Sequence, residues 1–305
     1  MKNNLAIGID LGGTHIKYAL ASVEGTIYWE AKKTTDAEQG REAMIERLAE
    51  CVKEAIDVAP SFGEVLCTGI GTSGLVDIER GYVLGGAPNL PDWEDLPLAS
   101  ILSEKTGLPT FVDNDANLMG LGEYRYGFGG EGNHMIFLTI GTGIGGGMII
   151  NGELYRGHHF AGAELGCIPM NCEEKTGYWE DFASTSAMVT HYKSLQKEPV
   201  KEEIDGKYIT KAFFQGEQAA IDTMEKHTHL VAMGVAGIVN IFNPEHIVIG
   251  GGISEAGEFY IEKIKQKVEG LAMEDCFRGV QLSAAKLGNK AGFLGATYFA
   301  FSQLK

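Results

Sequence analysis

No uninterrupted apolar run of about 18 residues or more occurs in this sequence, and a shorter run does not span a membrane as a helix. The opening residues, MKNNLAIGID, lack the apolar core and cleavage site of a signal peptide. The five cysteines are scattered along the chain and do not suggest a disulfide framework. We therefore expect a cytoplasmic protein with free thiols and no membrane partner.

Basic residues are also scarce. Lysine and arginine number 25 together, against 41 aspartates and glutamates, which gives a formal net charge of -16. A surface that binds nucleic acid needs a basic patch to neutralise phosphates. We therefore expect no nucleic-acid partner, and the acidity is typical of a soluble enzyme.

Glycine, in contrast, is plentiful, with 42 residues. Residues 7–20 and 134–157 each read as an apolar strand, a glycine-rich turn with a threonine, and a second strand. Helical spacing of apolar residues predicts helices over residues 36–58 and 215–242. Because 305 residues exceed one typical core, the two similar units suggest an α/β protein with a duplicated fold.

Glycine turns between strands expose successive backbone N–H groups, which suits them to bind phosphate. One such turn is weak evidence, because hairpins need glycine anyway, but a third glycine group follows the apolar strand within residues 246–252. The chain has no G-x-x-x-x-G-K-[ST] phosphate loop. A G-x-G-x-x-G match begins at Gly141, but a predicted strand follows it where a dinucleotide-binding fold needs a helix.

Two aspartates lie where phosphoryl transfer would need carboxylates. Asp10 stands beside the first glycine turn, where it would repel phosphate unless Mg²⁺ lay between them, bound directly or through water. Asp115, at a predicted strand end in VDNDAN, could accept the proton of an attacking hydroxyl. Plainer roles stay open: Asp10 as a turn residue, and Asp115 with Asn114 as a helix cap.

Over nearly its whole length the chain resembles the ROK family of sugar kinases and repressors, in the wider actin-like ATPase group. The resemblance rests on the order and spacing of seven segments: GIDLGGTHIK, GTSGLVD, APNLPDWEDLPL, VDNDAN, IGTGIGGGMIINGELYRG, AGAELG and GGGIS. It implies an α/β fold of two ribonuclease-H-like (actin-like ATPase/sugar kinase) domains around a cleft. The expected domains are residues 1–117, with a C-terminal helix over 291–305 packing back on them, and residues 118–290.

The resemblance also implies roles for individual residues. It makes Asp115 the catalytic base. It makes Asp10 the ligand of Mg²⁺, either directly or through a bound water. Sugar contacts and phosphate-binding residues follow from the same segments. The implied sugar contacts are Asn89, Asn114, Glu164 and Glu180. The implied ATP-binding and phosphate-binding residues are Asp10, Gly12, Gly13, Thr14, Lys17, Gly141, Thr142, Gly143, Gly251 and Gly252.

The activity implied is ATP-dependent phosphorylation of a hexose, from glucose to glucose 6-phosphate, with ATP and Mg²⁺ required. N-acetylmannosamine, N-acetylglucosamine, mannose, fructose and β-glucosides remain alternative acceptors. Family members are commonly dimers or tetramers, so a homo-oligomer is expected.

Two departures from the family pattern concern metal and substrate. Cys167 stands where the family has a histidine, and NCEEKTGYWED replaces C-x-C-G-x-x-G-C-x-E, with Tyr178 at the last cysteine position. Family members hold a structural zinc with that histidine and those cysteines, so no structural zinc is expected here. Ligation of a metal by Cys167 and Cys172 with His158 or His159 is a weaker alternative.

Three other functions compete with a kinase. A family repressor would carry a helix-turn-helix segment before the first phosphate turn, whereas six residues precede Ile7 and the charge is acidic. A sugar sensor without catalysis stays open because a sugar-contacting histidine is missing. A nucleotide-only ATPase stays open as well, and analysis of the products would distinguish it from a kinase.

Overall fold

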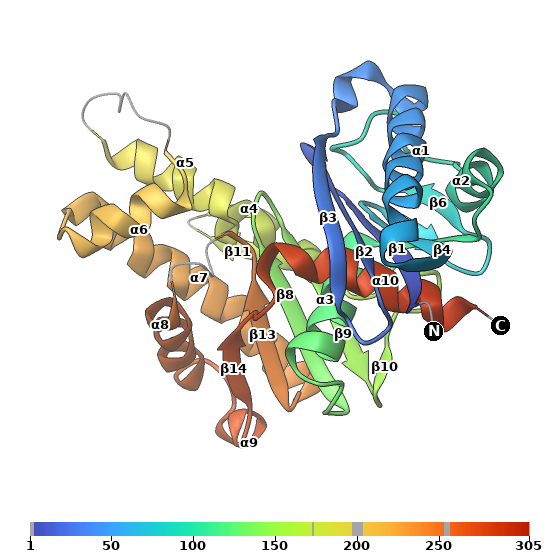
Figure 1. Cartoon of the computed structure of the whole chain (residues 1–305). Coiled ribbons are helices and arrows are strands. Elements are labelled where there is room, and N and C mark those ends of the chain that lie inside the picture. The colour runs from blue at the N-terminus through green and yellow to red at the C-terminus, as the bar shows by residue number, and fades with distance from the viewer. Residues whose placement is uncertain (1–2, 173, 197–203, 253–256, 305) are drawn as a thin grey trace. The chain divides into compact units, whose positions relative to one another are not determined.

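The computed structural model describes residues 3–172, 174–196, 204–252 and 257–304 (Figure 1). The charge-rich segment 197–203 and the end of GGGIS lie outside these ranges. The chain divides into two compact units. The first comprises Met1–Glu131, Leu154–Gly162 and Leu287–Lys305, and the second comprises Gly132–Glu153 and Ala163–Lys286.

Strands and helices alternate along most of the described chain. The strands are β1 (Asn3–Leu11), β2 (His15–Ala21), β3 (Ile27–Thr34), β4 (Gly63–Thr72), β5 (Leu75–Asp77), β6 (Tyr82–Gly85), β7 (Thr110–Asn114), β8 (His134–Ile140), β9 (Ile144–Ile150), β10 (Glu153–Leu154), β11 (Pro169–Cys172), β12 (Lys175–Tyr178), β13 (His246–Gly250) and β14 (Gln281–Ala284). The α-helices are α1 (Arg41–Val58), α2 (Leu98–Thr106), α3 (Asp115–Gly122), α4 (Trp179–Ala183), α5 (Thr185–Leu195), α6 (Gly206–Phe214), α7 (Gln218–Phe242), α8 (Glu258–Glu269), α9 (Glu274–Phe277) and α10 (Ala291–Gln303).

The two main sheets have the same topology. Their strand orders are β3-β2-β1-β4-β7 and β10-β9-β8-β13-β14. Each begins with an antiparallel hairpin, β1–β2 or β8–β9, and its first strand then pairs in parallel with β4 or β13. A further parallel strand, β7 or β14, follows. The predicted α/β class with two ribonuclease-H-like domains is confirmed.

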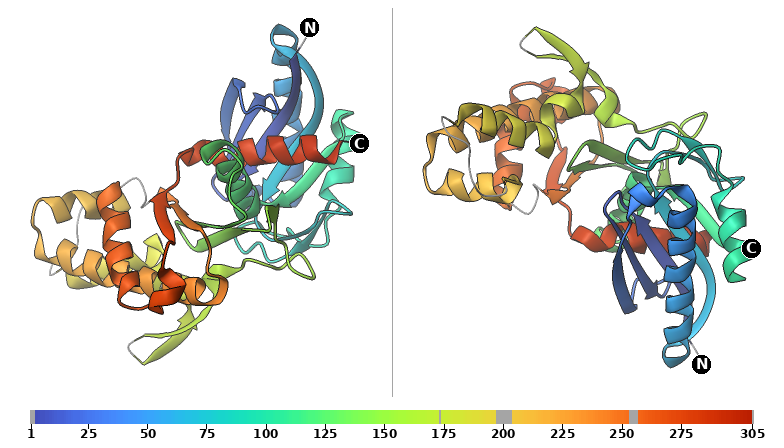
Figure 2. Two further views of the ribbon diagram at one scale, coloured as in Figure 1. Left: turned by 90° about the horizontal axis from the view of Figure 1, so that it is seen from below. Right: turned by 90° about the horizontal axis from the view of Figure 1, so that it is seen from above.

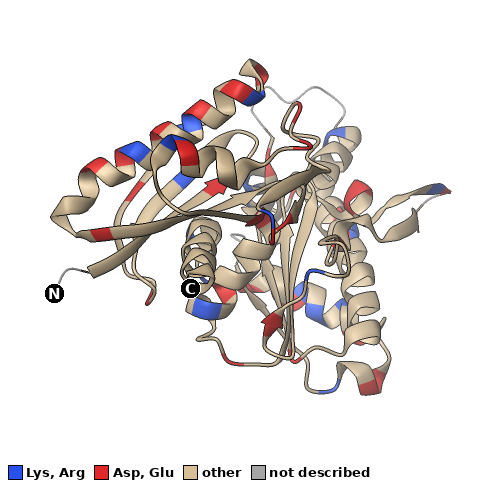
Figure 3. Cartoon of the chain, turned by 90° about the vertical axis from the view of Figure 1, so that its right-hand side faces the viewer, with Lys and Arg blue, Asp and Glu red and all other residues tan. Residues whose placement is uncertain are grey.

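Helix α1 begins later than the sequence predicts. Asp36 and Gly40 have φ of 48° and 87°, so the backbone leaves the helical region twice before Arg41. The apolar spacing itself is confirmed, because the core of the first unit includes Met44 and Leu48. Acidic and basic residues are interleaved along this helix in Figure 3.

Helix α10 packs very closely on the sheet of the first unit (Figure 2). A Cβ at Gly8 of β1 would lie 1.9 Å from the Phe293 carbonyl oxygen, so glycine is required for this approach. Helix α3 also packs on α10. The predicted domain boundary after residue 117 falls inside this helix. The structure groups the chain as far as Glu131 with the first unit.

Replacement of Gly295 by alanine is expected to destabilise the first unit. A Cβ there would lie 1.7 Å from the Leu118 carbonyl oxygen, so α10 and α3 must separate, at a cost of about 1–3 kcal/mol or more. Gly237 in α7 is the matched control, because a Cβ there meets no atom within 4 Å and alanine gains up to about 1 kcal/mol of helix propensity. Urea unfolding would measure both changes, and equal shifts would contradict the close packing.

The second unit is built around the long helix α7. This helix begins at Gln218 rather than residue 215, because Gly216 adopts a φ of 81°. Its buried face joins the strands of the second sheet in one apolar core. Among the described helices, none combines the length and apolarity that a membrane crossing needs.

Candidate active site

The first glycine turn, which joins β1 and β2, is braced by its own backbone. The Gly12 N–H donates to the His15 carbonyl at 3.0 Å, and the Gly12 carbonyl accepts the Thr35 hydroxyl at 2.6 Å. A Cβ at Gly13 would lie 3.3 Å from the Asn89 Cβ. The turn and the exposed Asn89 are therefore neighbours, which places a predicted sugar contact beside a predicted phosphate-binding turn.

Asp10 lies at the end of β1, opposite Lys17 of β2. The Lys17 ammonium is 3.8 Å from the Asp10 carboxylate and also donates to the Asn289 amide oxygen at 2.9 Å. Burial raises the pKa of Asp10 from 3.8 to about 6; Lys17 opposes this rise and the charge of Asp115 adds to it. Carboxylate oxygens are ligands that suit a hard cation such as Mg²⁺, so the chemistry of Asp10 fits the predicted metal ligand.

Asp115 is the first residue of α3, while Asn114 is the cap. The Asn114 side-chain oxygen accepts the Asn117 N–H at 3.0 Å. The Asp115 Oδ2 accepts the Ser73 hydroxyl at 3.1 Å, and its Oδ1 accepts the Ala116 N–H at 2.8 Å. Burial raises the pKa of Asp115, against the opposing effect of the Ser73 hydrogen bond. The capping role therefore belongs to Asn114, and the Asp115 carboxylate keeps acceptor capacity for another proton donor.

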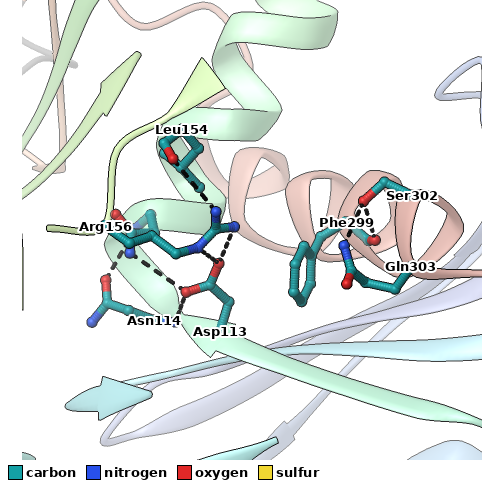
Figure 4. A network of polar contacts seen from close by, with 8 residues as sticks. Asp113, Asn114, Leu154, Arg156, Phe299, Ser302 and Gln303 are labelled. Carbon is teal, nitrogen blue, oxygen red and sulfur yellow. Dashed lines mark hydrogen bonds and ion pairs between the residues drawn. The ribbon is translucent and has the colours of Figure 1, made fainter. Parts of the chain in front are cut away.

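Asp113 is the last residue of β7 before the cap Asn114, and Asp115 lies beyond the strand, in α3. Its side chain is 1% exposed and accepts two hydrogen bonds from Arg156, from Nε at 2.9 Å and Nη2 at 2.7 Å (Figure 4). Burial raises the pKa of Asp113, and Arg156 opposes this rise. Arg156 and Ser73 lie in the segments ELYRG and GTSG, where no sequence pattern marks either residue as functional.

The second glycine turn, which joins β8 and β9, lies against Glu180, one of the residues predicted to contact the sugar. The Gly141 N–H donates to the Gly143 carbonyl at 2.9 Å, and the Ile144 N–H donates to Glu180 Oε2 at 3.0 Å. A Cβ at Gly143 would lie 2.5 Å from the same oxygen. Gly251 lies close to the start of this turn, because a Cβ added there would lie 2.2 Å from the carbonyl oxygen of Ile140, the last residue of β8.

The remaining glycine-turn residues, Thr142 and Gly252, are both exposed, as is Thr14 in the first turn. The structure thus brings Glu180 and Gly251 to the second turn, within the second unit. It brings Asn89 to the first turn, within the first unit.

Cys167 is three residues after Glu164, and the charges of both predicted sugar-contacting glutamates act on its thiol. Burial raises the pKa of its thiol, and the charges of Glu164 and Glu180 raise it further. Glu164 is exposed, just before the short 3₁₀ helix that contains Cys167. No group of three or more His, Cys, Asp or Glu side chains arranged to hold a metal occurs in the part of the chain that the structure describes. The absence of structural zinc stays a prediction.

Glu180 owes its position to the preceding tryptophan. Trp179 is fully buried, and its indole N–H donates to the Leu230 carbonyl of α7 at 2.9 Å. A Cβ at Gly234 would lie 2.1 Å from the indole ring. The short helix α4 is therefore anchored to α7 at the residue adjoining Glu180.

Comparison with known proteins identifies the family. Residues 6–303 match the model of the ROK family. The chain belongs to the ROK family. This ROK protein is 38% identical over 307 residues to a glucokinase of Thermotoga maritima, with 95% of each chain covered. It is 32% identical over 316 residues to a putative xylose repressor of a Caldicellulosiruptor species, covering 98% of this chain and 79% of the repressor.

A crystal structure of a ROK family glucokinase from Streptomyces griseus, in complex with glucose and AMPPNP, is similar throughout. Its TM-score is 0.83 at 33% identity, with 98% of this chain and 99% of that chain covered. The family resemblance read from the sequence is confirmed. The ROK family includes both enzymes and repressors among these relatives, so the family alone does not decide between these activities.

Proposed function

We propose that this ROK protein is an ATP-dependent kinase that phosphorylates a hydroxyl of a hexose, with glucose as the first candidate. The carrying observation is Asp115, a carboxylate with a raised pKa held by Ser73 in the same unit as Asp10 and the first glycine turn. Similarity to the Thermotoga glucokinase and to the structure with glucose and AMPPNP supports this choice.

Asp115 is the catalytic base in this proposal. Its carboxylate accepts the proton of the sugar hydroxyl while the hydroxyl oxygen attacks the γ-phosphorus and ADP leaves. Backbone N–H groups of the two glycine turns bind the phosphates, together with Lys17, Gly251 and Gly252. Asp10 would hold Mg²⁺, directly or through water, and the bound ion supplies charge neutralisation at the phosphates.

The sugar contacts differ in the hydrogen-bonding capacity that they have left. Asn114 already caps α3 and donates from Nδ2 to the Gly74 carbonyl at 3.0 Å, so it keeps one N–H and one lone pair. Glu180 uses Oε2 for Ile144, which leaves Oε1 for a sugar hydroxyl. Asn89 and Glu164 are exposed and complete the proposed set.

The acceptor is tested by ADP release from MgATP with glucose, mannose, fructose, N-acetylglucosamine, N-acetylmannosamine and cellobiose in turn. We expect glucose to stimulate release most. If another sugar stimulates release most, the kinase proposal stands and that sugar replaces glucose as the proposed acceptor. Sugar binding seen by calorimetry without any ADP release would contradict the kinase and support a sensor or repressor. Analytical ultracentrifugation tests the homo-oligomer, a dimer or tetramer, that we propose from the family.

Glu180→Gln is expected to raise KM for the sugar by roughly 10- to 100-fold, because a hydrogen bond to a charged acceptor contributes about 1.5–3 kcal/mol. Glutamine can still accept the Ile144 N–H, so KM for ATP should change little. Glu269→Gln, at an exposed position at the end of α8, is the matched control. Steady-state kinetics with each substrate varied would measure both constants; an unchanged KM for the sugar would remove Glu180 from the sugar site.

A further inference from the structure

We propose that the Arg156–Asp113 ion pair is a positioning device for the base Asp115 and the sugar contact Asn114. This inference rests on the proposed kinase function. The pair joins two segments far apart in the sequence, the end of β7 and the segment that follows β10, and both belong to the first unit. Neither side chain is assigned any contact with substrate, so the proposed action of the pair is through the backbone that it holds.

The aspartate side of the pair fixes the start of α3. Asp113 Oδ1 accepts the backbone N–H of Asn114 at 2.7 Å and the side-chain amide of Asn117 at 3.4 Å. Its other oxygen, Oδ2, accepts both hydrogen bonds from Arg156. A carboxylate committed on both oxygens has a single orientation, and the peptide leading into Asp115 is held with it.

The arginine side is restrained as well (Figure 4). Arg156 Nη1 donates to the Leu154 carbonyl at 3.4 Å, and the guanidinium carbon lies 5.5 Å from the centre of the Phe299 ring of α10. The Arg156 carbonyl accepts the Gly162 N–H at 2.9 Å, which closes the short loop between them. The guanidinium therefore reaches Asp113 from a fixed backbone and is packed on an aromatic face.

Chemistry distinguishes this pair from a simple stabilising contact. A buried ion pair often adds little net stability, because desolvation of both charges offsets their attraction. Two donors of one planar guanidinium on the same oxygen supply orientation, and a lysine ammonium cannot reproduce that planar pair of donors. A displacement of the base by about 1 Å can cost about 100-fold in rate, so orientation two residues from Asp115 has a large kinetic effect.

Four variants test the proposal: Arg156→Gln, Arg156→Lys, Asp113→Asn, and Asp113→Asn with Arg156→Gln. We expect each single change to lower kcat by about 100-fold with KM for MgATP unchanged. The double variant should be no slower than either single variant, because both remove the same interaction. Lys33→Gln is the matched control, since it breaks the Lys33–Glu54 ion pair, 2.8 Å long, on the edge strand β3 of the same sheet.

Amide hydrogen exchange without substrates gives an independent measurement. We expect faster exchange at residues 114–118 in the single variants and no change there in Lys33→Gln. Unchanged exchange together with wild-type kcat in Arg156→Gln would overturn the proposal, as would full kcat in Arg156→Lys. If Arg156→Gln does not fold, Arg156→Lys and Asp113→Asn still provide both readouts. If the wild type phosphorylates no sugar, the kinase proposal fails, while hydrogen exchange still tests the positioning of this strand end.

Discussion

Asp115→Asn is expected to lower kcat for sugar phosphorylation by about 10²- to 10⁴-fold, the usual contribution of a general base. Asparagine is similar in shape: its Oδ1 can still accept the Ala116 N–H, and its Nδ2 can donate to the Ser73 hydroxyl oxygen, which also accepts. It cannot accept a proton from the sugar hydroxyl. Binding of glucose, measured by calorimetry, should therefore be retained while turnover is lost.

The same substitution should change the pH dependence. Because burial raises the pKa of Asp115, the base is protonated and inactive over a pH range that lies above the ordinary range of an aspartate. Wild-type kcat/KM should rise as pH rises through this pKa, and the residual activity of Asp115→Asn should lack that rise. Asp222→Asn, an exposed carboxylate on α7, is the matched control. Full activity in Asp115→Asn would show that another group, or none, accepts the proton.

Asp10→Asn is expected to stabilise the protein near neutral pH while it abolishes kinase activity. The folded pKa of Asp10 is raised from 3.8 to about 6, which at about 1.4 kcal/mol per pKa unit corresponds to about 3 kcal/mol. Because folding raises the pKa of Asp10, protonation of Asp10 stabilises the folded state. This contribution to the free energy of unfolding is fully present below the unfolded pKa of 3.8 and is lost as pH rises through the folded pKa of about 6. Asparagine does not ionise, so the Asp10→Asn variant does not lose stability in this way as pH rises.

Urea unfolding of wild type and Asp10→Asn between about pH 4 and pH 8 measures this difference. The advantage of the variant should grow with pH and reach up to about 3 kcal/mol. Added Mg²⁺ should stabilise the wild type more than the variant, because a ligand that binds only the folded state shifts the equilibrium toward it. A pH-independent difference would contradict the raised pKa, and equal stabilisation by Mg²⁺ would remove Asp10 from the proposed metal site.

Local patterns made the repeated hairpins predictable from the sequence. Each hairpin carries its glycines between two apolar strands, so its signal is contained within residues 7–20 or 134–157. The Asn151–Gly152 turn after β9 is similarly local, with φ of 56° and 78°. Where a backbone reversal has no such signal, prediction fails: Asp36 adopts a positive φ inside a segment whose apolar spacing reads as helix.

The candidate site was predictable only in part, because its polar side chains are paired over long sequence distances. The segment VDNDAN marks Asp115 and Asn114 as candidate site residues, because both stand at the end of a predicted strand. Nothing in a single sequence pairs Asp113 with Arg156, 43 residues later, or Ser73 with Asp115, 42 residues later. Those contacts depend on the parallel pairing of β4 with β7 and on the return of the chain to the first unit after β10.

Phosphorus NMR of a reaction containing glucose, MgATP and the wild-type protein tests the central claim most directly. The account predicts a sugar-phosphate ester signal that grows in equal amount with ADP, and almost no such signal with Asp115→Asn. Formation of ADP with inorganic phosphate alone would show an ATPase rather than a sugar kinase. No ADP with any sugar of the panel, although sugar binds, would contradict the proposed phosphoryl transfer.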